Sequence, residues 1–187
     1  MNSLKKNAVF VTFCFSLLAM NAQYEMKPVE GYSPQIGLMV YMLEDLKSRI
    51  TAEVKDLDQA QTDFVFDKDA NSIGSLLMHL VSTEAYFQIE TLEERQWSDE
   101  EKARFGIGAG LNEESKEKLK GKPIQHYLDL WEEVREKTLA GLKTKDDAWF
   151  ASNVDEDMNY HWAWYHVMEH SANHMGQIAL VKNRLDK

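Results

Sequence analysis

Cysteine is almost absent from this sequence. The single cysteine, Cys14, lies in an apolar run near the N-terminus, and no other occurs among the 187 residues. A disulfide framework needs paired cysteines, and thiol catalysis needs a cysteine in the folded domain. The domain that follows this run has neither, so its stability must come from a packed core or a bound metal ion.

Positive charge is also scarce. The chain has 21 lysine and arginine residues against 31 aspartate and glutamate residues, a net charge of −10. Nucleic acids and anionic membrane surfaces attract basic proteins. The acidic balance therefore argues against both as partners. It leaves a small-molecule substrate as the expected partner and allows a homodimer.

The N-terminal segment predicts export. The basic start "MNSLKK" is followed by the apolar run "AVFVTFCFSLLAM" and a small residue, a pattern typical of a secretory signal peptide. We expect cleavage after Ala22, with residues 1–22 as the signal and 23–187 as one domain. Cleavage removes Lys5 and Lys6, leaving 19 basic and 31 acidic residues, a charge of −12. The mature protein would be periplasmic or secreted, without a stable membrane span; the alternative is a retained anchor.

Proline and glycine are few, and they divide the chain into long periodic stretches. Only three prolines and nine glycines occur, and the pattern between them favours an all-α domain. We expect helices from Ser33-Pro34 to about Val54, from Asn71 or Ser72 to about Arg95, from about Pro123 to Gly141, and from Asn159 to Arg184. Residues 97–122 hold four glycines and predict a long connection, a lid or a crossover, with a short helix at "SDEEKAR".

The second predicted helix carries an acid on its apolar face. At 100° per residue, one narrow arc holds Ile73, Leu76, Leu77, Leu80, Glu84 and Phe87. Glu84 therefore belongs to the buried stripe. Together with Tyr86 it is a candidate for contact with a nearby site or for acid–base chemistry.

The last predicted helix is nearly free of charge. Between Asn159 and Val181 the only charged residue is Glu169, which is expected of a helix surrounded by protein. A single arc of about 100° holds His166, His170, Asn173, His174 and Gln177. Trp131, Trp162 and Trp164 are interpreted as core or pocket-wall residues. Buried imidazoles need each other, a carboxylate, water or a cation as partners.

The histidine stretch "HVMEHSANHMGQI" contains two metal-site spacings. His166, Glu169 and His170 spell H-x-x-E-H, the inverted zinc-protease pattern, whereas His170 and His174 form H-x-x-x-H. The protease pattern needs a downstream glutamate, but no acid follows Glu169 until Asp186. The helical wheel also turns Glu169 about 60–100° away from the two histidines. We therefore favour His170 and His174 as ligands and leave His166 open as a ligand or a neighbour.

A third ligand must come from another helix. Histidines four residues apart have Cβ atoms roughly 5–6 Å apart, close enough to share one ion, and His79 is the only histidine of the second helix. Three neutral imidazoles leave coordination positions for water and substrate. Zinc, nickel and ferrous iron all accept nitrogen ligands. His126 and His161 are interpreted as surface or capping histidines.

Two segments, "SIGSLLMHLVSTE" and "HVMEHSANHMGQI", resemble the DinB-like superfamily. The resemblance implies an up-and-down four-helix bundle with a long connection between helices two and three. It also implies a divalent metal ion held at one mouth of the bundle by His79, His170 and His174. Met175 stands where relatives commonly have arginine. Characterised relatives include transferases and isomerases that use low-molecular-weight thiols, and predicted export argues against a cytosolic thiol.

The expected function is that of an exported metalloprotein, a metal-dependent hydrolase or group transferase. His166 and Glu84 would contact the metal ligands or the substrate from outside the coordination sphere. The alternative is a non-catalytic metal-binding or interaction bundle. A metal-free bundle with a hydrogen-bonded histidine core is the third possibility.

Overall fold

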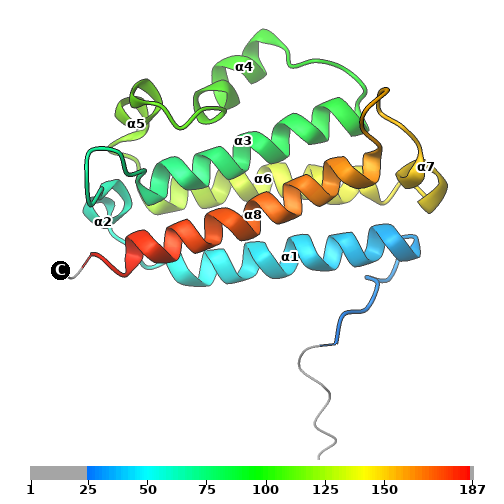
Figure 1. Ribbon diagram of the computed structural model, residues 1–187, viewed down its shortest axis with the longest axis horizontal. Helices are drawn as coiled ribbons and strands as arrows, with labels where there is room; N and C mark the ends of the chain where they lie inside the picture. The colour runs from blue at the N-terminus through cyan, green and yellow to red at the C-terminus, as the bar shows by residue number, and fades with distance from the viewer. Residues whose placement is uncertain (1–24, 186–187) are drawn as a thin grey trace, which may run out of the picture.

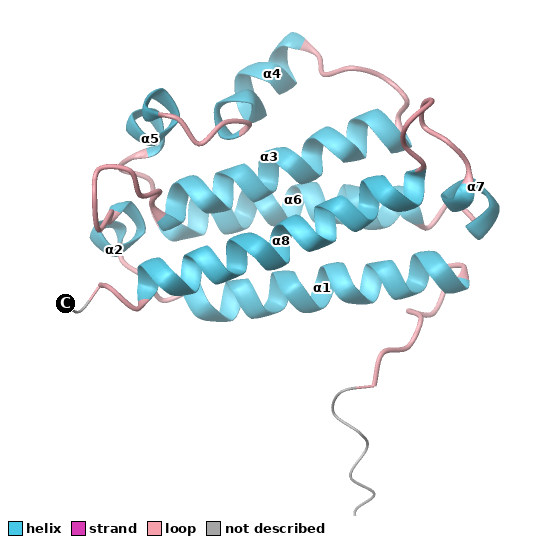
Figure 2. Cartoon of the chain, in the orientation of Figure 1, coloured by secondary structure: helices cyan, strands magenta, loops and turns pink. Residues whose placement is uncertain are grey.

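The computed structural model describes residues 25–185, all of whose regular elements are helices (Figure 2). The predicted signal peptide and its cleavage site lie outside the described residues. Within the described range there is no strand, only an isolated antiparallel bridge between Asn153 and Asn159. No helix in that range is both long and apolar enough to cross a membrane. The prediction of an all-α fold is confirmed.

Four long helices form the bundle, and each matches a predicted helix. They are α1 (Pro34–Val54), α3 (Ile73–Leu92), α6 (Ile124–Leu142) and α8 (Tyr160–Lys182) (Figure 1). The structure also has three short α-helices and one 3-10 helix that the sequence did not predict. They are α2 (Gln59–Asp63), α5 (Glu113–Leu119), α7 (Asp147–Ala151) and η1 (Gly106–Gly108). The predicted short helix is α4 (Asp99–Phe105).

The connection between α3 and α6 is a crossover. It runs back along the outer side of α3, carrying α4, η1 and α5 with it (Figure 1). As a result α6 runs in the same direction as α3: Glu84 contacts Arg135, and Gln88, one turn later, bonds to the Val134 carbonyl and the Thr138 hydroxyl. α1 and α8 run the other way. The directions of the four long helices therefore do not strictly alternate. The connection brings the chain back to the start of α3 without adding a fifth helix to the core, so α3 and α6 run in parallel.

Local hydrogen bonds explain where two of the long helices begin. The Ser72 hydroxyl accepts from Ser75 N (3.1 Å) at the start of α3, and the Asn159 side chain accepts from Trp162 N (2.7 Å) at the start of α8. Pro34 occupies the first turn of α1, but Ser33 does not cap it.

The cap of α1 comes from a distant element. Asp147, at the start of α7, accepts a hydrogen bond from Gln35 N (3.0 Å) and another from the Ser33 hydroxyl (2.6 Å). A carboxylate at a helix N-terminus satisfies free N–H groups and is favoured by the helix dipole. Asp147 thus ties the segment between α6 and α8 to the first turn of α1.

The predicted apolar stripe of α3 is buried, but α8 differs from expectation. Trp131 and Trp164 are fully buried, whereas Trp162 is 50% exposed and Tyr165 and Leu180 are also exposed. The prediction that protein surrounds α8 is therefore wrong. Apart from Glu169, its outer face is uncharged yet open to solvent, because aromatic and small residues occupy positions that usually carry charges.

Candidate metal centre

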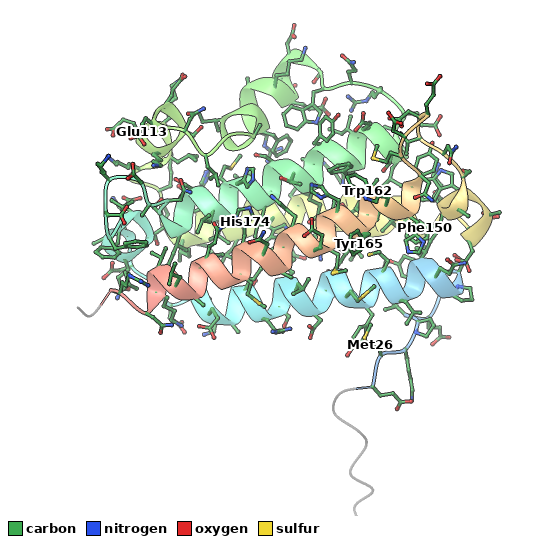
Figure 3. The ribbon with its side chains drawn as sticks, viewed as in Figure 1. Met26, Glu113, Phe150, Trp162, Tyr165 and His174 are labelled. Atoms are coloured by element: carbon green, nitrogen blue, oxygen red, sulfur yellow. The ribbon has the colours of Figure 1, made fainter. Side chains whose placement is uncertain are left out.

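Three histidines meet where α3 and α8 pack together. His79 comes from α3, and His170 and His174 lie on successive turns of α8; Figure 3 shows His174 at the seam between the two helices. His170 Nε2 lies 3.1 Å from His79 Nε2 and 3.0 Å from His174 Nε2. One ligand atom from each residue fits within 4.8 Å of the other two. The structure thus brings together the three predicted ligands.

Hydrogen bonds orient two of these rings. His79 Nδ1 lies 2.7 Å from the carbonyl oxygen of Gly108, which can only accept, so Nδ1 carries the proton. His174 Nδ1 lies 3.1 Å from the side-chain oxygen of Gln177. A neutral imidazole has one N–H group, so Nε2 of both rings is left with a lone pair that points into the cluster.

Burial favours the uncharged form of the two α8 rings. Burial, followed by the neighbouring rings of His174, His79 and His166, lowers the pKa of His170 to about 3. Burial also lowers the pKa of His174, with a further contribution from His79. His170 and His174 are therefore available as neutral ligands at ordinary pH.

The donor set fits a divalent ion. His170 Nε2 can donate a proton to only one of its two neighbours, His79 Nε2 and His174 Nε2. At least one of these two close nitrogen–nitrogen contacts therefore has no proton in it. A cation would satisfy all three nitrogen atoms. Nitrogen ligands about 2.0–2.1 Å from an ion stand roughly 3.0–3.4 Å apart, which agrees with the 3.1 and 3.0 Å from His170 Nε2 to the Nε2 atoms of His79 and His174. Zinc, nickel and ferrous iron remain compatible.

Gly108 is a site residue that the sequence prediction missed. A Cβ atom there would lie 2.5 Å from the carbonyl oxygen of Met78, so only glycine lets η1 approach α3 this closely. The Ser82 hydroxyl, 2.7 Å from the carbonyl oxygen of Phe105, holds the same segment. The glycine-rich run "FGIGAG" is the only sequence feature that points to Gly108, and by itself it predicts a loop rather than a contact with a metal ligand.

His166 lies beside the cluster rather than in it. Its ring centroid is 5.5 Å from that of His170, and it stacks on Trp162 at 5.2 Å with an interplanar angle of 2°. Its Nδ1 lies 3.0 Å from Glu169 Oε1. The expectation that Glu169 turns away from the histidines is therefore wrong for His166, because a side chain three residues later on a helix can reach back.

Glu84 has a different set of partners from the one expected. Its carboxylate accepts from Arg135 Nε (2.7 Å), Arg135 Nη2 (2.8 Å) and Trp131 Nε1 (2.8 Å), and the side chain is 1% exposed. Burial opposes its ionisation, but the charge and hydrogen bonds of Arg135 outweigh this, so the pKa of Glu84 lies below its ordinary value. No described hydrogen bond joins it to the histidines. We therefore assign Glu84 a structural role.

The remaining candidates lie outside the cluster. Tyr86 contacts Phe87 and Trp97, with ring centroids 5.2 and 6.0 Å away. His161 is exposed and stacks on Phe150, and His126 is half-buried beside Tyr127 at the start of α6. Neither histidine belongs to the three-residue group.

Comparison with protein families agrees with this geometry. The family model described as mycothiol-S-transferase matches residues 38–187, a range that includes all three clustered histidines. The chain belongs to the mycothiol-S-transferase family. This family membership confirms the DinB-like resemblance and narrows it to a family named for a thiol transfer.

Solved structures support the fold of this family member. A conserved protein from Enterococcus faecalis is similar with a TM-score of 0.62 and 14% sequence identity, over 78% of this chain and 94% of that one. At this identity the likeness shows the fold alone. No curated protein matches the chain.

Proposed function

We propose that this member of the mycothiol-S-transferase family is a metal-dependent transferase. It would join the sulfur of a low-molecular-weight thiol, of the kind that the family is named for, to an electrophilic carbon. The observation that carries the proposal is that one imidazole nitrogen atom from each of three histidines lies within 4.8 Å of the other two, with the rings of His79 and His174 oriented by second hydrogen bonds. We propose zinc, nickel or ferrous iron as the ion.

The chain's own residues have distinct tasks in this proposal. His79, His170 and His174 would hold a divalent ion, whose Lewis acidity favours the thiolate over the thiol when it is bound. Gly108 and Gln177 fix the ring orientations. The low pKa of His170 keeps that ring from competing for the proton.

His166, paired with Glu169, would take up the thiol proton. Because His166 Nδ1 faces the Glu169 carboxylate, Nε2 is the free basic atom, and the carboxylate stabilises the charged ring that forms. In the transfer, the carbon–sulfur bond forms and the leaving group departs with its electron pair. The proton passes from the thiol to His166 Nε2, so the step needs no oxidant or reductant.

We also propose that the protein acts after export. Support comes from the basic start and apolar run of the first 22 residues. Intact mass of the protein from cell envelope and medium fractions tests this: loss of residues 1–22 agrees with a cleaved signal, and full length in the cytosol contradicts it.

Metal analysis paired with a transfer assay tests the function. Protein purified without a histidine tag should carry about one divalent ion per chain and should couple a thiol from a panel including mycothiol and cysteine to iodoacetamide. His170→Ala and His174→Ala should lose the ion and at least 100-fold in rate. His161→Ala, which changes an exposed histidine of the same helix, should keep both.

Three results would count against the proposal. Absence of bound divalent metal from the unaltered protein contradicts the site. Metal binding without transfer of any thiol favours the non-catalytic bundle. Hydrolysis of esters at the same rate with and without thiol favours a hydrolase that uses the same three histidines.

A further inference from the structure

Four side-chain rings form a row along one face of α8. Trp162, His166, His170 and His174 follow one another at intervals of four residues, and the centroids of neighbouring rings lie 5.2, 5.5 and 4.4 Å apart. Figure 3 labels the two ends of the row, Trp162 and His174. Exposure is 50% at Trp162 and only 6% at His174. Trp162 is the one member of the row without a task in the proposed metal site or proton transfer.

The contact between Trp162 and His166 differs from the other contacts in the row. Side chains four residues apart on a helix are neighbours, so their proximity alone needs no special explanation. The planes of these two rings, however, are parallel within 2°. His166 is tilted by 33° to His170, and His170 lies at 81° to His174. Only the first pair of the row is therefore stacked, with the indole against one face of the His166 imidazole.

The other contacts of His166 do not fix the plane of its ring. Glu169 Oε1 lies 3.0 Å from His166 Nδ1, which constrains one atom of the ring. The side chains of this pair are 33% and 40% exposed, so water competes for the hydrogen bond. Phe87 of α3 meets the imidazole at 65°, with centroids 5.5 Å apart. Among the described residues, Trp162 is thus the one whose ring lies flat against His166.

Trp162 contributes little to the core of the bundle. It belongs to neither of the two hydrophobic clusters of the described structure, whereas Trp131 and Trp164 are buried within them. Half of its surface is open to solvent, and its one ring partner among the described residues is His166. An indole that lies outside the core and flat against a single imidazole is placed to orient that ring rather than to stabilise the bundle.

We propose that Trp162 is a positioning residue for the proton transfer. Its indole face holds the His166 imidazole in the plane in which Nδ1 faces Glu169, so that Nε2 stays available to the thiol. The inference rests on the proposed transferase function, in which the thiol proton passes to His166 Nε2, and it adds no chemical step. Because the described stack joins Trp162 to His166 and not to a ring of the three-histidine cluster, metal binding does not depend on it.

Nuclear magnetic resonance with zinc, a diamagnetic ion, tests the stack without relying on activity. The indole ring current should shift the ring-proton signals of His166 to higher field, and these signals are identified by their absence from His166→Ala. Trp162→Ala and Trp162→Leu should lose the shift because neither offers a flat aromatic face, whereas Trp162→Phe should keep part of it. Tyr165→Ala is the matched control and should leave the signals in place. This tyrosine is 47% exposed on the same helix but is not among the described ring partners of His166.

Transfer of a thiol to iodoacetamide gives the second measurement. Trp162→Ala and Trp162→Leu should each lower kcat about tenfold, with KM changed less than about twofold and the metal content kept. Trp162→Phe should keep about half of the unaltered rate or more, and Tyr165→Ala all of it. If Trp162 acts through His166, adding Trp162→Ala to His166→Ala should cause no further loss of kcat.

Three results would overturn the inference. They are His166 signals that keep their shift in Trp162→Ala, a further loss of about tenfold in kcat when Trp162→Ala is added to His166→Ala, and full activity of His166→Ala itself. Failure of the proposed function looks different. If the shift depends on Trp162 but the unaltered protein transfers no thiol to any acceptor, the stack is supported and the transferase function is rejected.

Discussion

The bundle contains two polar clusters whose members are matched in opposite ways: the Arg135–Glu84 cluster is fully buried, and the histidine cluster is partly buried. In the first, Arg135 donates to Glu84, to the Leu43 carbonyl (2.8 Å) and to Glu44 (2.7 Å), so opposite charges satisfy one another. In the second, His79, His170 and His174 present nitrogen atoms of one kind to each other. The first cluster is complete without a ligand, whereas the second has the ligand atoms to hold a cation. Burial of polar groups alone therefore does not mark a functional site; an unmatched set of donors or acceptors does.

Breaking the complete cluster should have the largest effect on stability. Arg135→Met leaves the Glu84 carboxylate buried without its partner and should lower the free energy of unfolding by about 3–5 kcal/mol, measured by urea denaturation. The double variant Glu84→Leu with Arg135→Met removes both charges and should recover most of this loss. Equal destabilisation in the single and double variants would show that packing, not an unpaired charge, dominates.

Disturbing the support of the incomplete cluster should affect metal binding more than stability. Gly108→Ala forces η1 away from α3 and releases the His79 ring, so metal affinity should fall about 10- to 100-fold in competition with a chromophoric chelator. Gly106→Ala lies in the same short helix, but its added Cβ would meet only Trp97 Cζ3 at 3.9 Å, an ordinary contact. Equal affinities in the two variants would exclude the proposed role of the Gly108 carbonyl.

An exposed ion pair should have the smallest effect. Arg104 of α4 donates hydrogen bonds to the carboxylate of Glu133 in α6. These bonds lower the pKa of Glu133 to about 2 from its ordinary 4.5. The pair's contribution is therefore present above pH 4.5 and lost as pH falls towards 2. Since the side chains are 41% and 39% exposed, we expect only about 0.5 kcal/mol.

The pH profile of thermal unfolding checks this value. Glu133→Gln should be slightly less stable than the unaltered protein at pH 7, and the difference should shrink to nothing near pH 2. A difference that stays constant across this range would mean that Glu133 stabilises the connection through packing rather than charge.

Local pattern was enough to predict most of the fold. Proline at the start of α1, the side-chain caps at Ser72 and Asn159, and long periodic stretches each act within a few residues, so the sequence displays them directly. The histidine cluster was predictable for a related reason. The spacing of His170 and His174 is fixed by the helix, and α3 offers a single histidine to complete the set.

Features that depend on distant partners were not predictable. Arg135 follows Glu84 by 51 residues, so the acid on the apolar stripe looked like a candidate for chemistry instead of half of an ion pair. The role of Gly108 depends on where the connection is placed, which no local pattern reveals. The outer face of α8 was misjudged because lack of charge is typical of buried helices, yet Trp162 and Tyr165 show that an exposed face can lack it too.

Because Asp147 caps α1, this helix cannot be completed on the ribosome until the segment after α6 has been synthesised. Gln35 and Asp147 are 112 residues apart, and ribosomes add about 5–20 residues per second. The first turn of α1 therefore leaves the ribosome roughly 6–22 s before the carboxylate that completes it. The N-terminal helix is the first of the long helices to be made and among the last to be finished.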